Sequence, residues 1–170
     1  MKINIPITKA IFGNEEKEAI TKPLETGWVV QGPYVKKFED MFSKFTKSKY
    51  ALATTSCTSA LHLGLEAMGI NSNDKVIVPS FTWISSANAV EYTGAEVVFC
   101  DINLKTFNID ETKLNDLIEN DKSITCIMPV NLFGLCANMP FIMDLANKYS
   151  LKVIEDSACG FDSWIGDKHS

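Results

Sequence analysis

Short apolar runs alternate with segments of helical spacing along most of the chain. The apolar runs, which read as strands, lie at residues 50–53, 76–79, 97–101, 124–128 and 151–154. The helical patterns between them lie at residues 60–68, 84–93, 110–120 and 139–149. Such alternation predicts right-handed βαβ crossovers and a mainly parallel sheet that is covered on both faces. The expected fold class is therefore α/β, with three layers in the order α/β/α.

The residues before the first apolar run predict two helices joined by a loop. Asn14 can cap a short helix, which we expect Pro23 to stop. The loop at residues 27–33 holds Trp28, Val29 and Val30, which are costly to expose, so it should pack on this chain or on a partner. The second helix should start at Pro33, a good residue for a first turn. Its apolar positions recur at helical spacing and are expected in the core: Val35, Phe38, Phe42 and Phe45.

Composition narrows the function classes. The 170 residues are 46% hydrophobic, enough for one core and for one domain or a large part of one. A net charge of -5 and the lack of a basic cluster disfavour nucleic-acid binding. No apolar run is long enough for a membrane span or a signal peptide, and five cysteines without CxxC spacing fit a reduced compartment. We therefore expect a cytoplasmic protein. Two distant histidines give no support for a metal site.

Asp156 follows the last apolar run directly. Ligands of open α/β sheets bind outside the carboxyl ends of the strands, so this carboxylate should face a crevice. It could pair with a cationic ring nitrogen, which it would keep protonated. A helix N-cap or an ordinary loop acid is the plainer alternative, and Asp156 alone does not decide between them.

Two further strand ends carry groups that suit a ligand. Residues 54–59, hereafter the hydroxyl turn, read Thr-Thr-Ser-Cys-Thr-Ser and lead into a helix. Free backbone N–H groups, the helix dipole and hydroxyls suit a phosphate there, whereas helix capping by Ser56 or Thr58 is the simpler explanation. The turn is not a P-loop, because GxxxxGK[ST] is missing. Trp83 follows the next strand, either as a core residue or as a flat platform for a ring.

The three strand ends together describe one ligand. A phosphate site at the hydroxyl turn, an aromatic plate at Trp83 and a carboxylate at Asp156 would all be used by a flat, phosphorylated, cationic heteroaromatic ring. Pyridoxal phosphate is such a molecule, and its ring nitrogen needs an acid partner if the ring is to withdraw electrons. We therefore expect pyridoxal 5'-phosphate as the cofactor.

At these residues the sequence resembles the DegT/DnrJ/EryC1/StrS sugar aminotransferases, pyridoxal-phosphate enzymes of fold type I. The resemblance rests on residues 27–33 with Phe38 and Glu39, and on residues 55–61, 74–83, 99–102 and 153–158. It implies that Thr58 and Ser59 bind the phosphate, that Trp83 stacks on the ring and that Asp156 pairs with the ring nitrogen.

The sequence departs from the family pattern at three positions, two of which belong to the expected cofactor site. Cys57 stands where the family usually has glycine, and this narrows the backbone conformations without removing an N–H donor. Cys159 stands where Gln or His commonly lies near the ring hydroxyl, and a thiol is a poor hydrogen-bond partner. Asn131 occupies a place where the family often has His.

The resemblance also implies the domain organisation. Residues 1–170 would form the amino-terminal part of the pyridoxal-phosphate-binding large domain, without its remaining strands and without the small carboxyl-terminal domain. The lysine that bonds covalently to the cofactor would lie beyond residue 170, so this chain alone should be inactive.

The implied function is that of a sugar aminotransferase. The full-length enzyme would transfer an amino group, with glutamate as the expected donor, to a nucleotide-linked keto-sugar for polysaccharide, lipopolysaccharide or glycoside biosynthesis. It would act as a homodimer. Two alternatives stay open: a sugar dehydratase of the same family, in which His replaces the lysine, and a catalytically silent chain that acts by pairing with another chain.

Overall fold

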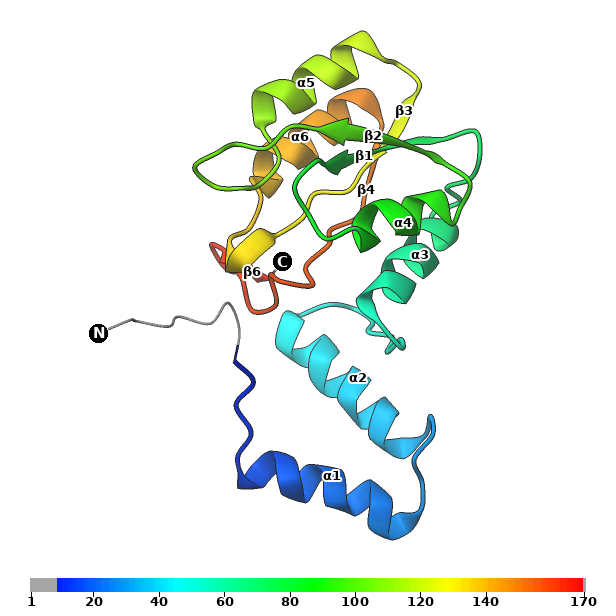
Figure 1. Cartoon of the computed structure of the whole chain (residues 1–170), viewed down its shortest axis with the longest axis vertical. Helices are drawn as coiled ribbons and strands as arrows, with labels where there is room; N and C mark the ends of the chain where they lie inside the picture. Colours follow the sequence, from blue (N-terminus) through cyan, green and yellow to red (C-terminus); the bar gives the residue numbers. More distant parts are fainter. Residues whose placement is uncertain (1–8, 170) are drawn as a thin grey trace, which may run out of the picture. The chain divides into compact units, whose positions relative to one another are not determined.

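The structure is a computed structural model and describes residues 9–169. The described residues divide into two compact units, one that ends at Ala51 and one that starts at Leu52. The first unit contains two helices, and the second contains the sheet with its covering helices (Figure 1).

The first helix, α1 (Asn14–Thr26), is longer than its sequence predicts. Pro23 lies inside the helix and does not stop it, so that prediction was wrong. The helix ends at Gly27, whose left-handed φ of 71° lets its N–H reach the carbonyl of Leu24. At the other end Gly13, and not Asn14, is the N-cap, and its N–H donates to Glu16 Oε2 over 2.6 Å.

The second helix, α2 (Pro33–Thr46), starts at Pro33 as predicted. Its apolar stripe is not part of a core, because no residue of α2 is buried, and Phe38 and Phe45 are 56% and 46% exposed. The loop before α2 is likewise open, with Val30 72% exposed. Helical spacing shows which side of a helix is apolar but not what covers that side, which is why the prediction of a core stripe was wrong.

The second unit follows the predicted α/β alternation. Its elements are α3 (Cys57–Ala67), β1 (Lys75–Pro79), α4 (Ser85–Glu91), β2 (Glu96–Cys100), α5 (Glu111–Asn120), β3 (Ile124–Ile127), the 3-10 turn η1 (Leu132–Gly134), α6 (Met139–Tyr149), β4 (Lys152–Val153), β5 (Trp164–Ile165) and β6 (Lys168–His169). The strands β2-β1-β3-β4 form a four-stranded sheet in that order, and every pairing is parallel. β5 and β6 pair as a separate antiparallel hairpin.

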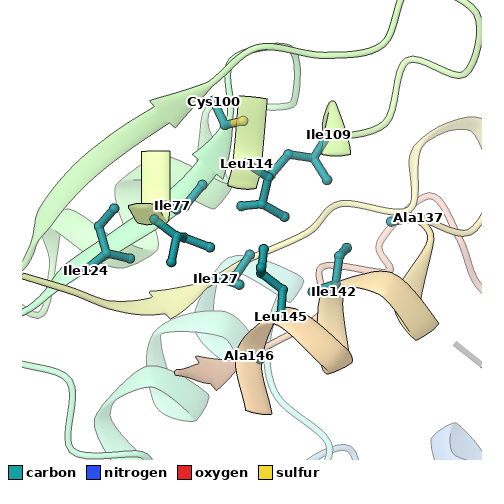
Figure 2. Close-up of a cluster of buried hydrophobic side chains, with 11 residues drawn as sticks. Ile77, Cys100, Ile109, Leu114, Ile124, Ile127, Ala137, Ile142, Leu145 and Ala146 are labelled. Atoms are coloured by element: carbon teal, nitrogen blue, oxygen red, sulfur yellow. The ribbon is translucent and has the colours of Figure 1, made fainter. Parts of the chain in front are cut away.

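Apolar side chains cover both faces of the parallel sheet. On one face Ile77 and Ile127 pack with Leu114 of α5 and Ile142 of α6 (Figure 2). On the other face Val76 and Val78 pack with side chains of α3 and α4. Figure 1 shows these helix pairs on opposite sides of the sheet. The predicted three-layer α/β/α class is confirmed.

One predicted strand does not form. Residues 50–53 are irregular, and Leu52 in this run is 67% exposed. An apolar run of four residues is compatible with a strand, a helix or a loop, and here the run is a loop. The hydroxyl turn therefore follows an irregular segment and not the end of a strand.

The direction of α3 determines where its first turn lies. Near its end, the carbonyl of Met68 accepts a hydrogen bond from Nζ of Lys152, which begins β4. The end of α3 therefore lies at the amino edge of the sheet, and its N-terminus lies toward the carboxyl edge. The strand order changes direction between β1 and β3, because β2 and β3 lie on opposite sides of β1. Ligands of doubly wound sheets bind at the carboxyl edge beside such a switch point.

Within residues 9–169, no helix is long and apolar enough to cross a membrane.

Candidate functional site at the carboxyl edge of the sheet

Asp156 lies just past β4, where its backbone continues the parallel pairing with the segment after β3. Its N–H donates to the carbonyl of Pro129, and its own carbonyl accepts from the N–H of Asn131, each over 2.9 Å. A bridge pairs Asp156 with Val130. The residue is only 5% exposed, so its carboxylate needs hydrogen-bond donors from the protein or from a ligand.

Three donors from different parts of the chain reach the Asp156 carboxylate. The hydroxyl of Ser86, on the first turn of α4, donates to Oδ2 over 2.7 Å. The N–H of Ala158 donates to Oδ1 over 3.1 Å, and the thiol of Cys57 lies 3.8 Å from the same oxygen. An ordinary loop acid would make the local bond to the N–H of Ala158. It would not be expected to accept bonds from residues on α3 and α4, as Asp156 does.

Cys57 is the first residue of α3, and its side chain turns toward the acid. Part of the residue is exposed, but the Cys57–Asp156 contact is partly buried. Burial, reinforced by the negative charge of Asp156, raises the pKa of the Cys57 thiol from 9.0 to about 11. The thiol therefore stays protonated at neutral pH and can act as a weak donor to the carboxylate.

The hydroxyl turn forms the N-terminus of α3. Ser56 is the N-cap, and its Oγ accepts the N–H of Ser59 over 3.1 Å, so the capping alternative holds for Ser56. Thr58 is not a cap, because it lies inside the first turn. The hydroxyls of Ser56 and Ser59 lie 3.0 Å apart. Helix geometry supplies no carbonyl for the N–H groups of Cys57 and Thr58, which makes this turn suitable for an anion.

Trp83 lies between the end of β1 and the start of α4. Its side chain is 77% exposed, so it is not a core residue. The neighbouring backbone is fixed, because the carbonyl of Trp83 accepts the N–H of Ser86 over 3.1 Å. The same Ser86 bonds to Asp156, which places the exposed indole on a segment that is tied to the acid.

Asn131 bonds to the residues on either side of Asp156. It is fully buried, and its Nδ2 donates to Ser157 Oγ over 2.8 Å and to Glu155 Oε2 over 3.0 Å. Its Oδ1 accepts the N–H of Ala137 over 2.8 Å. A Cβ on Gly160 would lie 2.5 Å from Asn131 Cβ, so the turn also needs a glycine there. Asn131 thus connects the segments that follow β3 and β4.

The predicted site residues lie as follows. Cys57 and Asp156 are in contact, and Thr58 and Ser59 follow Cys57 in the first turn of α3. Trp83 is exposed and lies three positions before Ser86. Cys159 is exposed in the turn after the acid. The sequence reasoning missed Ser86. Its signal was a polar residue in a segment of small side chains directly after Trp83, and four of the seven residues of that helix are buried.

The site can hold a flat, phosphorylated, cationic ring. A carboxylate offers about four lone-pair positions, and the three donors to Asp156 leave one on Oδ2 for a ring N–H. The first turn of α3 offers N–H groups and hydroxyls to a phosphate. The indole of Trp83 offers an exposed aromatic face.

Comparison with known proteins gives a consistent result. Residues 10–170 match the profile of the DegT/DnrJ/EryC1/StrS aminotransferase family. The GDP-perosamine synthase of Caulobacter vibrioides is 42% identical over 155 residues, which are 91% of this chain and 41% of that protein. The spore coat polysaccharide biosynthesis protein SpsC of Bacillus subtilis is 39% identical over 154 residues, 91% of this chain and 39% of that protein.

Solved structures agree with the sequence relatives. The Escherichia coli GDP-4-keto-6-deoxy-D-mannose-3-dehydratase with bound hydrated PLP superposes with a TM-score of 0.90 at 27% identity, covering 100% of this chain and 45% of that one. This chain therefore spans about two fifths of the length of the curated relatives it matches. The resemblance found in the sequence is confirmed: the chain belongs to the DegT/DnrJ/EryC1/StrS aminotransferase family.

Proposed function

We propose that this chain is part of the pyridoxal-phosphate-binding large domain of a sugar aminotransferase and that it supplies the non-covalent contacts to the cofactor. The observation that carries the proposal is the buried Asp156 carboxylate, which donors from α3, α4 and its own turn orient at the carboxyl edge of the sheet. The family membership and the PLP of the dehydratase that it resembles support the identity of the cofactor.

Each group in the site has one role toward the cofactor. The N–H groups of Cys57 and Thr58 and the hydroxyls of Thr58 and Ser59 bind the phosphate, and Trp83 stacks on the ring. Asp156 accepts the ring N–H and keeps the nitrogen protonated. Cys159 lies near the ring hydroxyl and bonds to it only weakly. The bound cofactor supplies an electron-withdrawing ring that stabilises negative charge on a substrate carbon.

We also propose that this chain alone does not catalyse transamination. Two lysines that flank the sheet are held at its amino edge, away from the acid: Lys75 starts β1 with Nζ 2.8 Å from Asp121, and Lys152 donates to Met68. In this proposal, the lysine that bonds to the cofactor lies in the part of the relatives' length that this chain does not cover. That lysine also moves the proton during the reaction.

The substrate that we propose for the whole protein is a nucleotide-linked keto-sugar, with glutamate as amino donor, and the product is an amino sugar for a polysaccharide, lipopolysaccharide or glycoside. The GDP-perosamine synthase and the spore coat protein support this class. A dehydratase of the same family is the second candidate, which the likeness to the Escherichia coli enzyme favours. A lysine or a histidine at the cofactor-bonding position distinguishes the two.

We propose a cytoplasmic homodimer as the native form. Exposed apolar side chains in the loop at residues 28–30 and along α2 support pairing, because a monomer gains nothing from exposing them. The five free cysteines support a reducing compartment.

Binding of pyridoxal phosphate tests the cofactor proposal. Pyridoxal phosphate and pyridoxal, which lacks the phosphate, are titrated into the protein, and tryptophan fluorescence is followed. We expect Asp156→Ala to weaken both ligands, by about tenfold for the loss of a charged hydrogen bond. Ser59→Ala should weaken pyridoxal phosphate but leave pyridoxal unchanged.

Asn147→Ala, an exposed change on α6, is the matched control and should alter neither affinity. Equal affinities for pyridoxal and pyridoxal phosphate, together with unchanged binding in Asp156→Ala, would rule out this site.

A further inference from the structure

We infer that Ser86 is a positioning residue for the cofactor acid: its hydroxyl fixes the Asp156 carboxylate so that Oδ2 faces the ring nitrogen. The inference rests on the proposed function and concerns a residue that the family resemblance did not single out.

The contact between Ser86 and Asp156 is short and protected from water. Ser86 Oγ lies 2.7 Å from Oδ2, Ser86 is fully buried and Asp156 is 5% exposed. Ser86 and Asp156 are 70 positions apart in sequence, so their contact depends on how the fold places the first turn of α4 beside the segment that follows β4. A hydrogen bond to a charged acceptor in a dry environment is stronger than one at the surface.

The direction of the Ser86 proton follows from its neighbours. Ser86 Oγ also lies 3.2 Å from the carbonyl of Trp83 and 3.0 Å from Thr82 Oγ1. A hydroxyl has one proton, and the shorter contact with a charged acceptor takes it. Thr82 then donates to Ser86, and Ser86 donates to Asp156. The segment from Thr82 to Ser86 thus links the indole that faces the ring with the acid that faces the ring nitrogen.

The bond restricts a rotation that the acid otherwise has. The last torsion of an aspartate side chain is broad and roughly two-fold, so a carboxylate with donors on one oxygen alone keeps much of its freedom. Ala158 and Cys57 both bond to Oδ1. Ser86 bonds to Oδ2, and the remaining lone pair of that oxygen then has a fixed direction. The ring N–H is accepted there.

The test compares pyridoxal phosphate with the analogue in which a CH group replaces the ring nitrogen. Only the first can donate to Asp156, so the ratio of the two dissociation constants measures how well the acid is placed. We expect the wild-type protein to prefer pyridoxal phosphate by about tenfold. Ser86→Ala should lower this preference by about threefold or more through weaker binding of pyridoxal phosphate alone.

Four variants complete the design. Ser86→Thr keeps the hydroxyl and should restore the preference, and Ser85→Ala, the neighbouring position on α4, should leave it unchanged. On an Asp156→Asn background, Ser86→Ala should have no further effect on the ratio. If Ser86→Ala does not fold, Ser86→Cys replaces it, because a thiol is a weaker donor of similar size and should give an intermediate preference.

The outcomes separate this inference from the proposed function. If Ser86→Ala weakens both ligands by the same factor, or leaves the ratio as in the wild type, Ser86 only packs and the inference is wrong. An unchanged ratio in Ser86→Cys leads to the same conclusion. If the wild-type protein itself does not prefer pyridoxal phosphate over the analogue, the role of Asp156 in the proposed function fails as well.

Discussion

The thiol of Cys57 lies 3.8 Å from Oδ1 of Asp156, although 99 positions separate the two residues. The contact joins the N-terminus of α3 to the end of β4. It brings the group expected to bind a phosphate and the group expected to bind a ring nitrogen to the same edge of the sheet.

The Cys57 thiol should react slowly with alkylating reagents. Its pKa is raised from 9.0 to about 11, so the reactive thiolate at pH 8 is about a hundredfold scarcer than for an ordinary thiol. Iodoacetamide labelling of Cys57, followed by peptide mass spectrometry from pH 7 to 12, should therefore rise with a midpoint near 11. Asp156→Asn removes one cause of the shift and should move the midpoint downward. A midpoint near 9 in the wild type would contradict the raised pKa of the Cys57 thiol.

Asn131 should be important for stability. Asn131→Ala leaves the N–H of Ala137 without its acceptor and removes the bonds to Glu155 and Ser157, the residues on either side of Asp156. We expect the free energy of unfolding, measured with urea, to fall by about 1–3 kcal/mol. Asn147→Ala is the control, because Asn147 is exposed on α6. Equal stability of the two variants would show that the buried network is not needed.

The sheet and its helices could be predicted because, in the second unit, the spacing of apolar residues and the apolar content of each run indicate the same element. Runs such as residues 76–79 are apolar at every position, which is the pattern of a strand buried on both faces. The secondary-structure predictions failed where the local sequence pattern alone does not determine the structure. Residues 50–53 have a short apolar pattern but no strand, and Pro23 lies inside α1 without ending it.

The candidate site was only partly predictable. Asp156 could be singled out because it follows an apolar run that forms a strand, and the hydroxyl turn because its hydroxyl residues lead into a helix. For Ser86 the sequence offers only a polar residue among small side chains, and this pattern does not indicate a partner 70 positions away. Cys57 was expected to serve the phosphate through its backbone, and the direction of its side chain toward the acid became visible only in three dimensions.

The Lys75–Asp121 ion pair should make stability depend on pH in the acid range. Nζ of Lys75 lies 2.8 Å from Asp121 Oδ2, and the hydrogen bond from Lys75 is the main cause that lowers the pKa of Asp121 below 3.8. A carboxyl group whose pKa is lower in the folded protein than in the unfolded chain stabilises the fold at pH values above its unfolded-state pKa. This stabilisation is lost as the pH falls toward the folded-state pKa. Asp121→Asn should therefore reduce the urea midpoint at pH 7 and make it less sensitive to pH below about 4. Identical pH profiles of wild type and variant would contradict the assignment.

The loop before α2 should contribute to assembly. Val30 is 72% exposed, and burying it in a homodimer would stabilise the pair. Val30→Asp should shift the sedimentation profile toward the monomer. Gln31→Asp introduces the same charge at the next position without removing an apolar side chain, and should leave the profile unchanged. A monomeric wild type at high concentration would exclude the homodimer.

The most direct test of the central claim is a crystal structure of the protein soaked with pyridoxal phosphate. The account predicts phosphate oxygens at the first turn of α3 beside Thr58 and Ser59, the ring against Trp83, and the ring nitrogen within hydrogen-bond distance of Asp156 Oδ2. Pyridoxal phosphate bound elsewhere, for example in the pocket lined by Met143, Glu155 and Lys168, with the Asp156 carboxylate untouched, would contradict it.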